Sequence, residues 1–318
     1  MNFFDTELYL NNKEILLVIA LILGILILAS LIFGIWAWLK PENKPVELIA
    51  RTRSWWVMAI VFVSATVIHP AISYVAFALL SFTALRELSS ISKHLRAEDR
   101  PIVIWGYLSI PVQYYLAYKG NYALFLLFIP VFMHMFIPFV LVMRGSTDGI
   151  ARAMSVLPTH LMLTVFAISH LAFLLSLPGS DSFRAGGRGL LLFVVFITEM
   201  NDVFQFIWGK ALGKHKILPK VSPNKTWEGF IGGIISTVVV GYFLRFLTPL
   251  NGMEALIISF VIACMGFAGD VVVSAIKRDI GIKDTGNLIP GHGGLLDRID
   301  SLAFTAPVFF HIIYNLYY

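Results

Sequence analysis

The sequence predicts an all-α polytopic membrane protein with about ten transmembrane helices. Of its 318 residues, 58% are hydrophobic and only 14% are charged, whereas soluble domains carry roughly 25% charged residues. The apolar runs are continuous rather than alternating, which argues against a β-barrel. The single cysteine, Cys264, lies within an apolar run, so neither an internal disulfide nor a cysteine-based metal site is available.

A polar lead, Met1–Lys13, precedes the first predicted span, Glu14–Leu39. The span has no basic region before it and no small-residue cleavage site after it. These absences favour a retained helix over a cleaved signal peptide. A polar loop, Lys40–Arg53, follows the span.

The region Trp55–Leu85 has two interpretations: one long helix, or a hairpin of two helices broken at His69-Pro70. The flanking loops, Lys40–Arg53 and Arg86–Arg100, each contain four Lys or Arg residues. The positive-inside rule places such loops on the same face of a membrane. Because one long helix would place them on opposite faces, charge favours the hairpin and gives ten spans.

The ten predicted spans divide the basic residues unequally between the two sides of the membrane. With ten spans, 19 of the 24 Lys and Arg residues lie on one side and 5 on the other, so we expect both termini to lie on the less basic side, which is the outside. Two spans are short for a bilayer and are expected to be partial or tilted. The spans after the hairpin are near Ile102–Ala117, Tyr122–Met143, Met154–Leu177, Gly189–Trp208, Phe230–Phe246, Ala255–Ala275 and Leu302–Tyr317.

The long polar stretch Ser274–Asp300 lies between the last two spans and contains a Pro-Gly-His-Gly-Gly turn. Such a stretch must lie in water or line a protected cavity. A solvated loop with orienting charges is the plain alternative to an active site. Asp270 favours an active site, because it lies within a span, where a lone carboxylate costs several kcal/mol.

Helical spacing brings these polar residues together. Asp270, Ser274 and Lys277 occur at i, i+4 and i+7 and share one helix face. Asp297 and Asp300 are expected to share a face at the start of the last helix, which Gly293-Gly294 would open. Carboxylates beside a helix N-terminus suit a hard cation and phosphate oxygens. The positive charge that a polyphosphate needs comes from Lys277, Arg278, Lys283 and Arg298, and His292 is expected either to contact phosphate or to form a structural hydrogen bond.

A second polar cluster begins within the seventh span at Glu199, Asn201 and Asp202. The lysine-rich loop after this span ends in a compact turn, Ser222–Thr226, which opens the eighth helix. Hydroxyl groups and a lysine at a helix N-terminus suit phosphate, although a capped helix after a basic loop explains them equally well. The glycines of Gly229-x-x-x-Gly233 indicate close helix packing.

The polar stretch resembles the signature of the phosphatidate cytidylyltransferase (CDP-diacylglycerol synthase) family. Gly269-Asp270 and the segment Ser222–Gly233 are also similar to that family, and the resemblance extends from about Trp55 to the end of the chain. Asp202 departs from the family pattern, because Asn201 precedes it and bulky residues follow it, which is typical of a divergent branch. The fixed signature positions are all filled, by Ser274, Lys277, Arg278, Lys283, Asp284, Gly286, Pro290, His292, Gly293, Gly294, Asp297, Arg298 and Asp300.

The resemblance implies a membrane-embedded cytidylyltransferase domain of nine spans at residues 54–318, preceded by an N-terminal addition at residues 1–53. It implies transfer of a cytidylyl group from CTP to phosphatidate, with the lipid phosphate as nucleophile, for phospholipid biosynthesis. Lys277 and Arg278 would stabilise the phosphates as catalytic residues, together with Asp270 and Asp297. These two aspartates would hold Mg²⁺ in a site for one or two cations, with Asp300 as a further ligand. The substrate-binding residues would be Asp202, Ser222, Asn224, Lys225, Thr226, Ser274, Lys283, Asp284, His292 and Arg298.

Three alternatives remain open at this point. A transporter or channel would use intramembrane carboxylates such as Asp202 and Asp270 along an ion path, but the polar residues gather at one face. A related CTP-dependent enzyme would use another lipid acceptor, such as an isoprenoid alcohol or an archaeal-type ether lipid. A non-catalytic homologue would act as a scaffold. We expect a multi-pass protein of the cytoplasmic membrane with its active site facing the cytoplasm, no nucleic-acid partner, and either a monomer or a homodimer.

Overall fold

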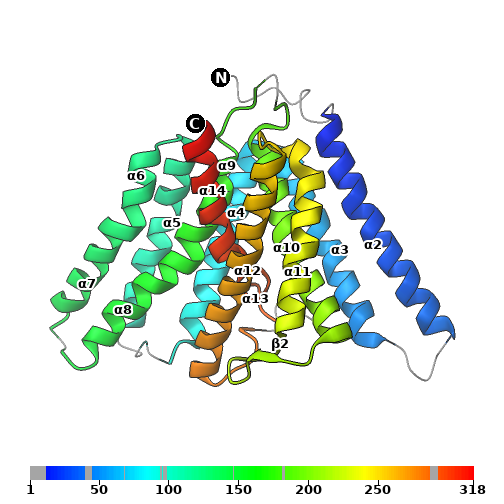
Figure 1. The fold of residues 1–318 in the computed structure, drawn as a ribbon. Helices are drawn as coiled ribbons and strands as arrows, with labels where there is room; N and C mark the ends of the chain where they lie inside the picture. The colour runs from blue at the N-terminus through cyan, green and yellow to red at the C-terminus, as the bar shows by residue number, and fades with distance from the viewer. Residues whose placement is uncertain are drawn as a thin grey trace.

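The computed structural model describes residues 12–39, 45–67, 69–93, 95, 99–145, 147–180, 183–286 and 293–318. Within these ranges ten helical segments pack side by side (Figure 1), and eight of them are long and apolar enough to cross a membrane. The predicted all-α polytopic class is therefore confirmed. Most of the predicted polar lead, residues 1–11, and His292 lie outside the described ranges.

The first three helices are α2 (Lys13–Leu39), α3 (Val46–Val67) and α4 (Pro70–Ile91). Helix α2 packs on α3, where Trp56 Nε1 donates a hydrogen bond to Ser30 Oγ at 3.0 Å. His69 is the N-cap of α4, because its Nδ1 accepts from the backbone N–H of Ala71 at 3.1 Å. Proline is favoured in the first turn of a helix but breaks a helix interior. The predicted hairpin with a break at His69-Pro70 is confirmed.

The middle of the chain forms three spans. The first is the single helix α5, whose 16 residues agree with the expectation of a short span. The other two spans are longer, and each contains a π-helical turn, with Pro130 inside one turn and Pro158 just before the other. A proline removes a backbone hydrogen-bond donor from a helix. The elements are η2 (Arg100–Ile102), α5 (Val103–Tyr118), α6 (Tyr122–Leu127), η3 (Phe128–Met133), α7 (His134–Met143), α8 (Ile150–Leu161), η4 (Met162–Phe166) and α9 (Ala167–Leu174).

The C-terminal part holds α12, the longest of the described helices, and the polar signature. Helices α10 and α11 approach closely, since a Cβ on Gly233 would lie 2.4 Å from Gln205 Cγ; the predicted glycine-mediated packing is confirmed. Buried Asn201 joins three helices, donating to Ala263 O and accepting from Thr237 Oγ1, both at 3.2 Å. The elements are α10 (Gly186–Leu212), α11 (Trp227–Leu244), η5 (Arg245–Leu247), α12 (Gly252–Ile280), α13 (Leu296–Ile299) and α14 (Leu302–Tyr317).

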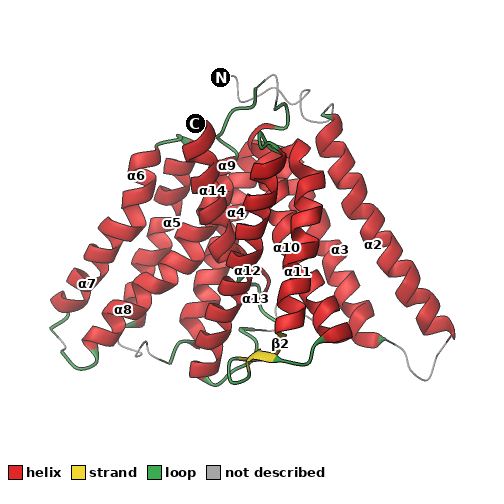
Figure 2. Ribbon diagram, in the orientation of Figure 1, coloured by secondary structure: helices red, strands yellow, loops and turns green. Residues whose placement is uncertain are grey.

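One local prediction is wrong. Ser222–Thr226 is not a compact turn but strand β2, which pairs antiparallel with β1 (Lys216–Leu218) (Figure 2). Strands this short carry too little hydrophobic periodicity to be predicted. The last span begins at Leu296, directly after Gly293-Gly294 and Leu295, as predicted; α13 continues through Asp300 and Ser301, which keep right-handed helical backbone angles, into α14.

The start of the first described helix and the end of the last helix lie at the same end of the bundle. The start of α2 and the end of α14 are both at the top of Figure 1, while β2 and the end of α12 lie at the bottom. Helix α13 lies part way up between them. The chain therefore crosses the bundle an even number of times, as the ten-span arrangement requires.

Candidate active site

Asp270 joins the end of α12 to strand β2. One carboxylate oxygen pairs with Lys225 Nζ at 2.6 Å, and the other accepts from Ser274 Oγ at 3.1 Å. Lys225 Nζ also lies 4.8 Å from the centre of the Phe267 ring, an attractive cation–π arrangement. The predicted shared face of Asp270 and Ser274 is thus confirmed, and Lys225 from the second polar cluster is brought to it.

Asp202 and Asp300 lie close to this pair. Both are held by Ser301, whose hydroxyl donates to Asp202 Oδ2 and whose backbone N–H donates to Asp300 Oδ1, each at 2.8 Å. Asp202 Oδ1 is buried and has no hydrogen-bond partner among the described residues. Asp300 is near enough to Asp270 and Asp202 to interact with both electrostatically. Three carboxylates from α10, α12 and the turn after α13 therefore concentrate negative charge in one place.

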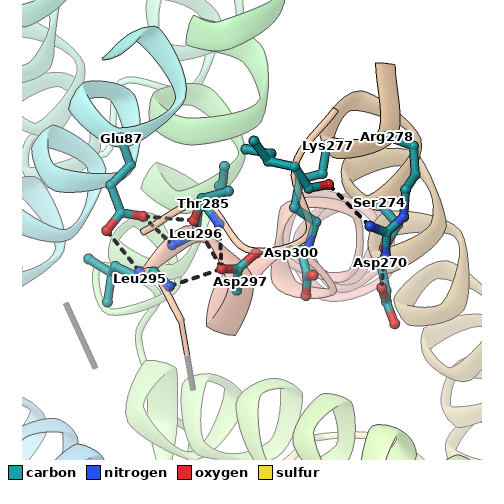
Figure 3. A network of polar contacts seen from close by, with 12 residues as sticks. Glu87, Asp270, Ser274, Lys277, Arg278, Thr285, Leu295, Leu296, Asp297 and Asp300 are labelled. Atoms are coloured by element: carbon teal, nitrogen blue, oxygen red, sulfur yellow. Dashed lines mark hydrogen bonds and ion pairs between the residues drawn. The ribbon is translucent and has the colours of Figure 1, made fainter. Parts of the chain in front are cut away.

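Asp297 has a different environment, which Figure 3 shows. Its Oδ1 accepts from Lys277 Nζ at 2.7 Å. Its Oδ2 accepts from the backbone N–H of Thr285 at 2.8 Å, from Thr285 Oγ1 at 3.1 Å and from the backbone N–H of Gly294 at 2.9 Å. Gly293 has a φ of +83°, and a Cβ there would lie 2.7 Å from Asp297 Oδ2, so only glycine fits.

Sequence reasoning missed Glu87, which reaches this network from α4. Its Oε1 accepts from the N–H of Leu295 at 2.9 Å, and its Oε2 accepts from the N–H of Leu296 at 2.9 Å and from Thr285 Oγ1 at 3.2 Å. Glu87 is 208 residues from Leu295 along the chain, so no local pattern indicates the contact. The sequence had placed it in a charged loop, whereas α4 continues to Ile91.

Arg278 binds backbone oxygens at the bottom of the bundle. Its Nε donates to Val221 O and its Nη1 to Ile282 O, both at 3.1 Å. The guanidinium group therefore ties the β-hairpin to the turn after α12. Its catalytic role stays a prediction.

The other predicted site residues are distributed around this core. Thr226 caps α11, because its Oγ1 accepts from the N–H of Gly229 at 3.2 Å. Ser222 and Arg298 are half-buried. Asn224, Lys283 and Asp284 are exposed on β2 and on the turn after α12. The predicted site residues that the structure describes thus lie on α10, β2, the second half of α12, the turn after it and α13 with the turn that follows.

The donor chemistry fits a hard divalent cation, although the full ligand set is not formed by the protein. Within the described ranges, no three His, Cys, Asp or Glu side chains are close enough together to hold an ion. Mg²⁺ typically takes only one or two carboxylates and completes its shell with water and substrate phosphates. The unpartnered Asp202 Oδ1 and the nearby Asp270 and Asp300 suit that arrangement. Asp297 suits it less, because four protein donors occupy its two oxygens.

The fold and the site together define a polytopic helical membrane protein with an acidic and lysine-containing cluster suited to phosphate-bearing substrates. The model of the cytidylyltransferase family matches residues 49–316. The chain therefore belongs to the cytidylyltransferase family, a family of nucleotidyltransferases, as the resemblance of its signature predicted.

Individual relatives are similar over different lengths. "Uncharacterized protein YnbB" of Escherichia coli (strain K12) is 45% identical over 298 residues, which cover 93% of this chain and 97% of that protein. A phosphatidate cytidylyltransferase of Staphylococcus haemolyticus is 40% identical over 127 residues, or 39% of this chain and 49% of that enzyme. A phosphatidate cytidylyltransferase of Staphylococcus epidermidis is 41% identical over 127 residues. The chain spans about half the length of these two enzymes.

Proposed function

We propose that the protein transfers a cytidylyl group from CTP to phosphatidate, giving CDP-diacylglycerol and pyrophosphate for phospholipid biosynthesis. The observation that carries the proposal is a cluster of charges in which Lys225 pairs with Asp270 and Lys277 pairs with Asp297. Asp300 lies near enough to Asp202, Asp270 and Lys277 to interact with them electrostatically. The names of the staphylococcal relatives support phosphatidate as the acceptor.

The proposed reaction needs no nucleophilic side chain. A phosphate oxygen of phosphatidate attacks the α-phosphorus of CTP, a new P–O bond forms, and the bond to the β-phosphate oxygen breaks. Pyrophosphate leaves with the bonding electron pair. Because both reactants are anions, the protein's main contribution is positioning and neutralisation of charge.

Two lysines supply that neutralisation. Lys225 is held by Asp270 and Lys277 by Asp297, and an ammonium group has three N–H donors. Each lysine therefore keeps donors for phosphate oxygens after forming its ion pair. The hydroxyl groups of Ser222, Thr226 and Ser274 lie on the same elements and are the proposed contacts to the nucleotide or lipid phosphate.

A divalent cation, Mg²⁺ in our proposal, would be held by Asp270 and Asp300, with Asp202 beside them and substrate phosphates completing its shell. When bound, it would neutralise charge on the phosphates. Asp297, also predicted as a ligand, would have to give up Lys277 or a backbone donor to reach a cation.

The test is an assay of the purified protein in detergent with phosphatidate, Mg²⁺ and labelled CTP, scored for a lipid-soluble cytidine product. We expect CDP-diacylglycerol to form and EDTA to stop its formation, with ATP in place of CTP as the matched control. If CTP binds but no lipid product forms, phosphatidate is the wrong acceptor and other lipid phosphates and alcohols replace it. If CTP does not bind to the folded protein, the transporter and scaffold alternatives replace the enzyme.

We also propose that the active site faces the cytoplasm. Lys119 is the C-cap of α5, just before α6 starts at the top of Figure 1, and Lys216 lies in β1, which pairs with β2 at the bottom. In a Cys264→Ser background, we expect a membrane-impermeant maleimide to label Lys119→Cys from outside the cell and Lys216→Cys only after permeabilisation. Labelling of both from the same side contradicts the ten-span arrangement, and the reverse pattern contradicts the orientation.

A further inference from the structure

Asp297 is the second residue of α13 and follows a polar stretch of the chain. After α12 this stretch passes through a turn at residues 281–286, and it continues from Gly293 into α13, which has four residues. Through Asp300 and Ser301, α13 continues into α14, so Asp297 lies in the first turn of the last span. The backbone N–H groups of a first turn have no partner within the helix, and the position of Asp297 therefore depends on contacts that hold this turn.

Glu87 of α4 provides such a contact at the start of α13. Its two carboxylate oxygens accept from the successive backbone N–H groups of Leu295 and Leu296, both at 2.9 Å (Figure 3). The first N–H groups of a helix have no partner within the helix. A carboxylate at this end also interacts favourably with the helix dipole. Glu87 thus fixes both the position and the direction of α13.

Thr285 connects Glu87 to Asp297. Its hydroxyl oxygen lies 3.2 Å from Glu87 Oε2 and 3.1 Å from Asp297 Oδ2. The two carboxylates therefore hold the same turn from opposite sides, and the single hydroxyl proton is available to either of them. A Cβ on Gly294 would lie 2.7 Å from Glu87 Oε2 and 2.1 Å from Thr285 Oγ1, so the backbone passes directly between these groups.

We propose that Glu87 is a positioning residue for cytidylyl transfer: it fixes the backbone around Asp297, and Asp297 in turn fixes the ammonium group of Lys277. The proposal rests on the function proposed above. Glu87 acts through Asp297 and not on a substrate. Through this contact the N-terminal helices, and not only the signature stretch, set the geometry of the site.

The experiment compares Glu87→Gln with Glu254→Gln in the full-length protein. Glu254 is a matched control, because it accepts from the N–H of Asn251 at 2.8 Å at the start of α12, at the opposite end of the bundle. Glutamine keeps the size of the side chain but loses the charge, and its amide can accept from only one of the two N–H groups. Hydrogen exchange of the peptide around Leu295 and Leu296 is measured without substrate, and kcat and KM for CTP are measured in the lipid assay.

We expect exchange at these amides to accelerate in Glu87→Gln and kcat to fall roughly 10- to 100-fold, with KM for CTP changed less than about threefold. Glu254→Gln should match the wild type in both measurements. The proposal is overturned if exchange or kcat is unchanged in folded Glu87→Gln, or if Glu254→Gln loses as much activity. Because exchange needs no substrate, an inactive wild type contradicts the proposed function and leaves the exchange result to decide the contact.

A second pair of variants keeps the proposal testable if Glu87→Gln does not fold. Thr285→Val removes only the hydroxyl between the two carboxylates, and Thr285→Ser retains it. We expect Thr285→Val to lower kcat by about 3- to 10-fold, the usual effect of one hydrogen bond, and Thr285→Ser to remain near the wild type. Equal kcat values for the two variants overturn the link from Glu87 to Asp297.

Discussion

The aspartates of the site form two groups, of which the first is Asp297 alone, and the protein satisfies the two groups differently. Asp297 is buried, and its oxygens accept from Lys277, from Thr285 twice and from Gly294. Asp202, Asp270 and Asp300 form the second group. They share fewer donors, and Asp202 Oδ1 has no partner in the part of the chain that the structure describes.

This difference in hydrogen bonding indicates different roles for the two groups. A carboxylate with several charge-assisted and backbone hydrogen bonds is stabilised in place, so Asp297 serves first to hold the turn and Lys277. Neighbouring carboxylates repel one another because they carry like charges. Their burial also raises the free energy of the folded protein unless a positive charge compensates them. The second group is therefore where a cation would lower the free energy most. The role of Asp297 as a metal ligand stays a prediction.

The largest expected effect comes from Asp270, which contributes to the second group and also holds Lys225. Asp270→Asn keeps the shape of the side chain but removes the charge that pairs with Lys225 and that would attract a cation. We expect turnover to fall by at least about 1000-fold in the CTP assay, with the protein still folded by size exclusion. Near-normal turnover in the purified variant would remove Asp270 from the proposed metal site.

The next largest effect concerns Asp297 and distinguishes its role in holding Lys277 from a direct role in catalysis. Asp297→Asn leaves the buried ammonium group of Lys277 without its counter-charge, and breaking a buried ion pair typically costs about 3–5 kcal/mol. We expect chemical unfolding in mixed micelles to show this loss of stability, which Asp270→Asn should not show. Adding Lys277→Met to Asp297→Asn should recover part of the stability but not the activity. Wild-type stability of Asp297→Asn would contradict the distinction between the two groups.

The sequence predicted the fold well because its main signals are local. Continuous apolar runs define the spans, and a run such as Tyr122–Met143 matches α6 to α7 at both ends. The distribution of charge favoured a hairpin over one long helix in Trp55–Leu85, and the break at His69-Pro70 is confirmed. The shared helix face of Asp270 and Ser274 could also be predicted from their spacing, because a helix repeats every 3.6 residues and α12 continues through both.

Contacts that join distant parts of the chain could not be predicted in this way. Nothing beside Glu87 in the sequence indicates that its partners are Leu295 and Leu296. The role of Asn201 was also hidden, because it depends on Ala263 and Thr237 from two other helices. The β-hairpin was missed because both strands are short and β2 is polar and contains a proline, which is unusual within a strand.

The smallest expected effect tests the hydrogen bond that orients Asp270 within the second group. Ser274→Ala removes the hydroxyl that donates to Asp270 Oδ1 at 3.1 Å, and one such bond contributes about 0.5–1.5 kcal/mol. We therefore expect the half-saturating Mg²⁺ concentration in the CTP assay to rise by about 3- to 10-fold. Ser259→Ala is the matched control on the same helix, because the buried Ser259 hydroxyl has no hydrogen-bond partner among the described residues. Equal Mg²⁺ dependence in the two variants would mean that Asp270 needs no orienting donor, and that the second group does not hold the cation through it.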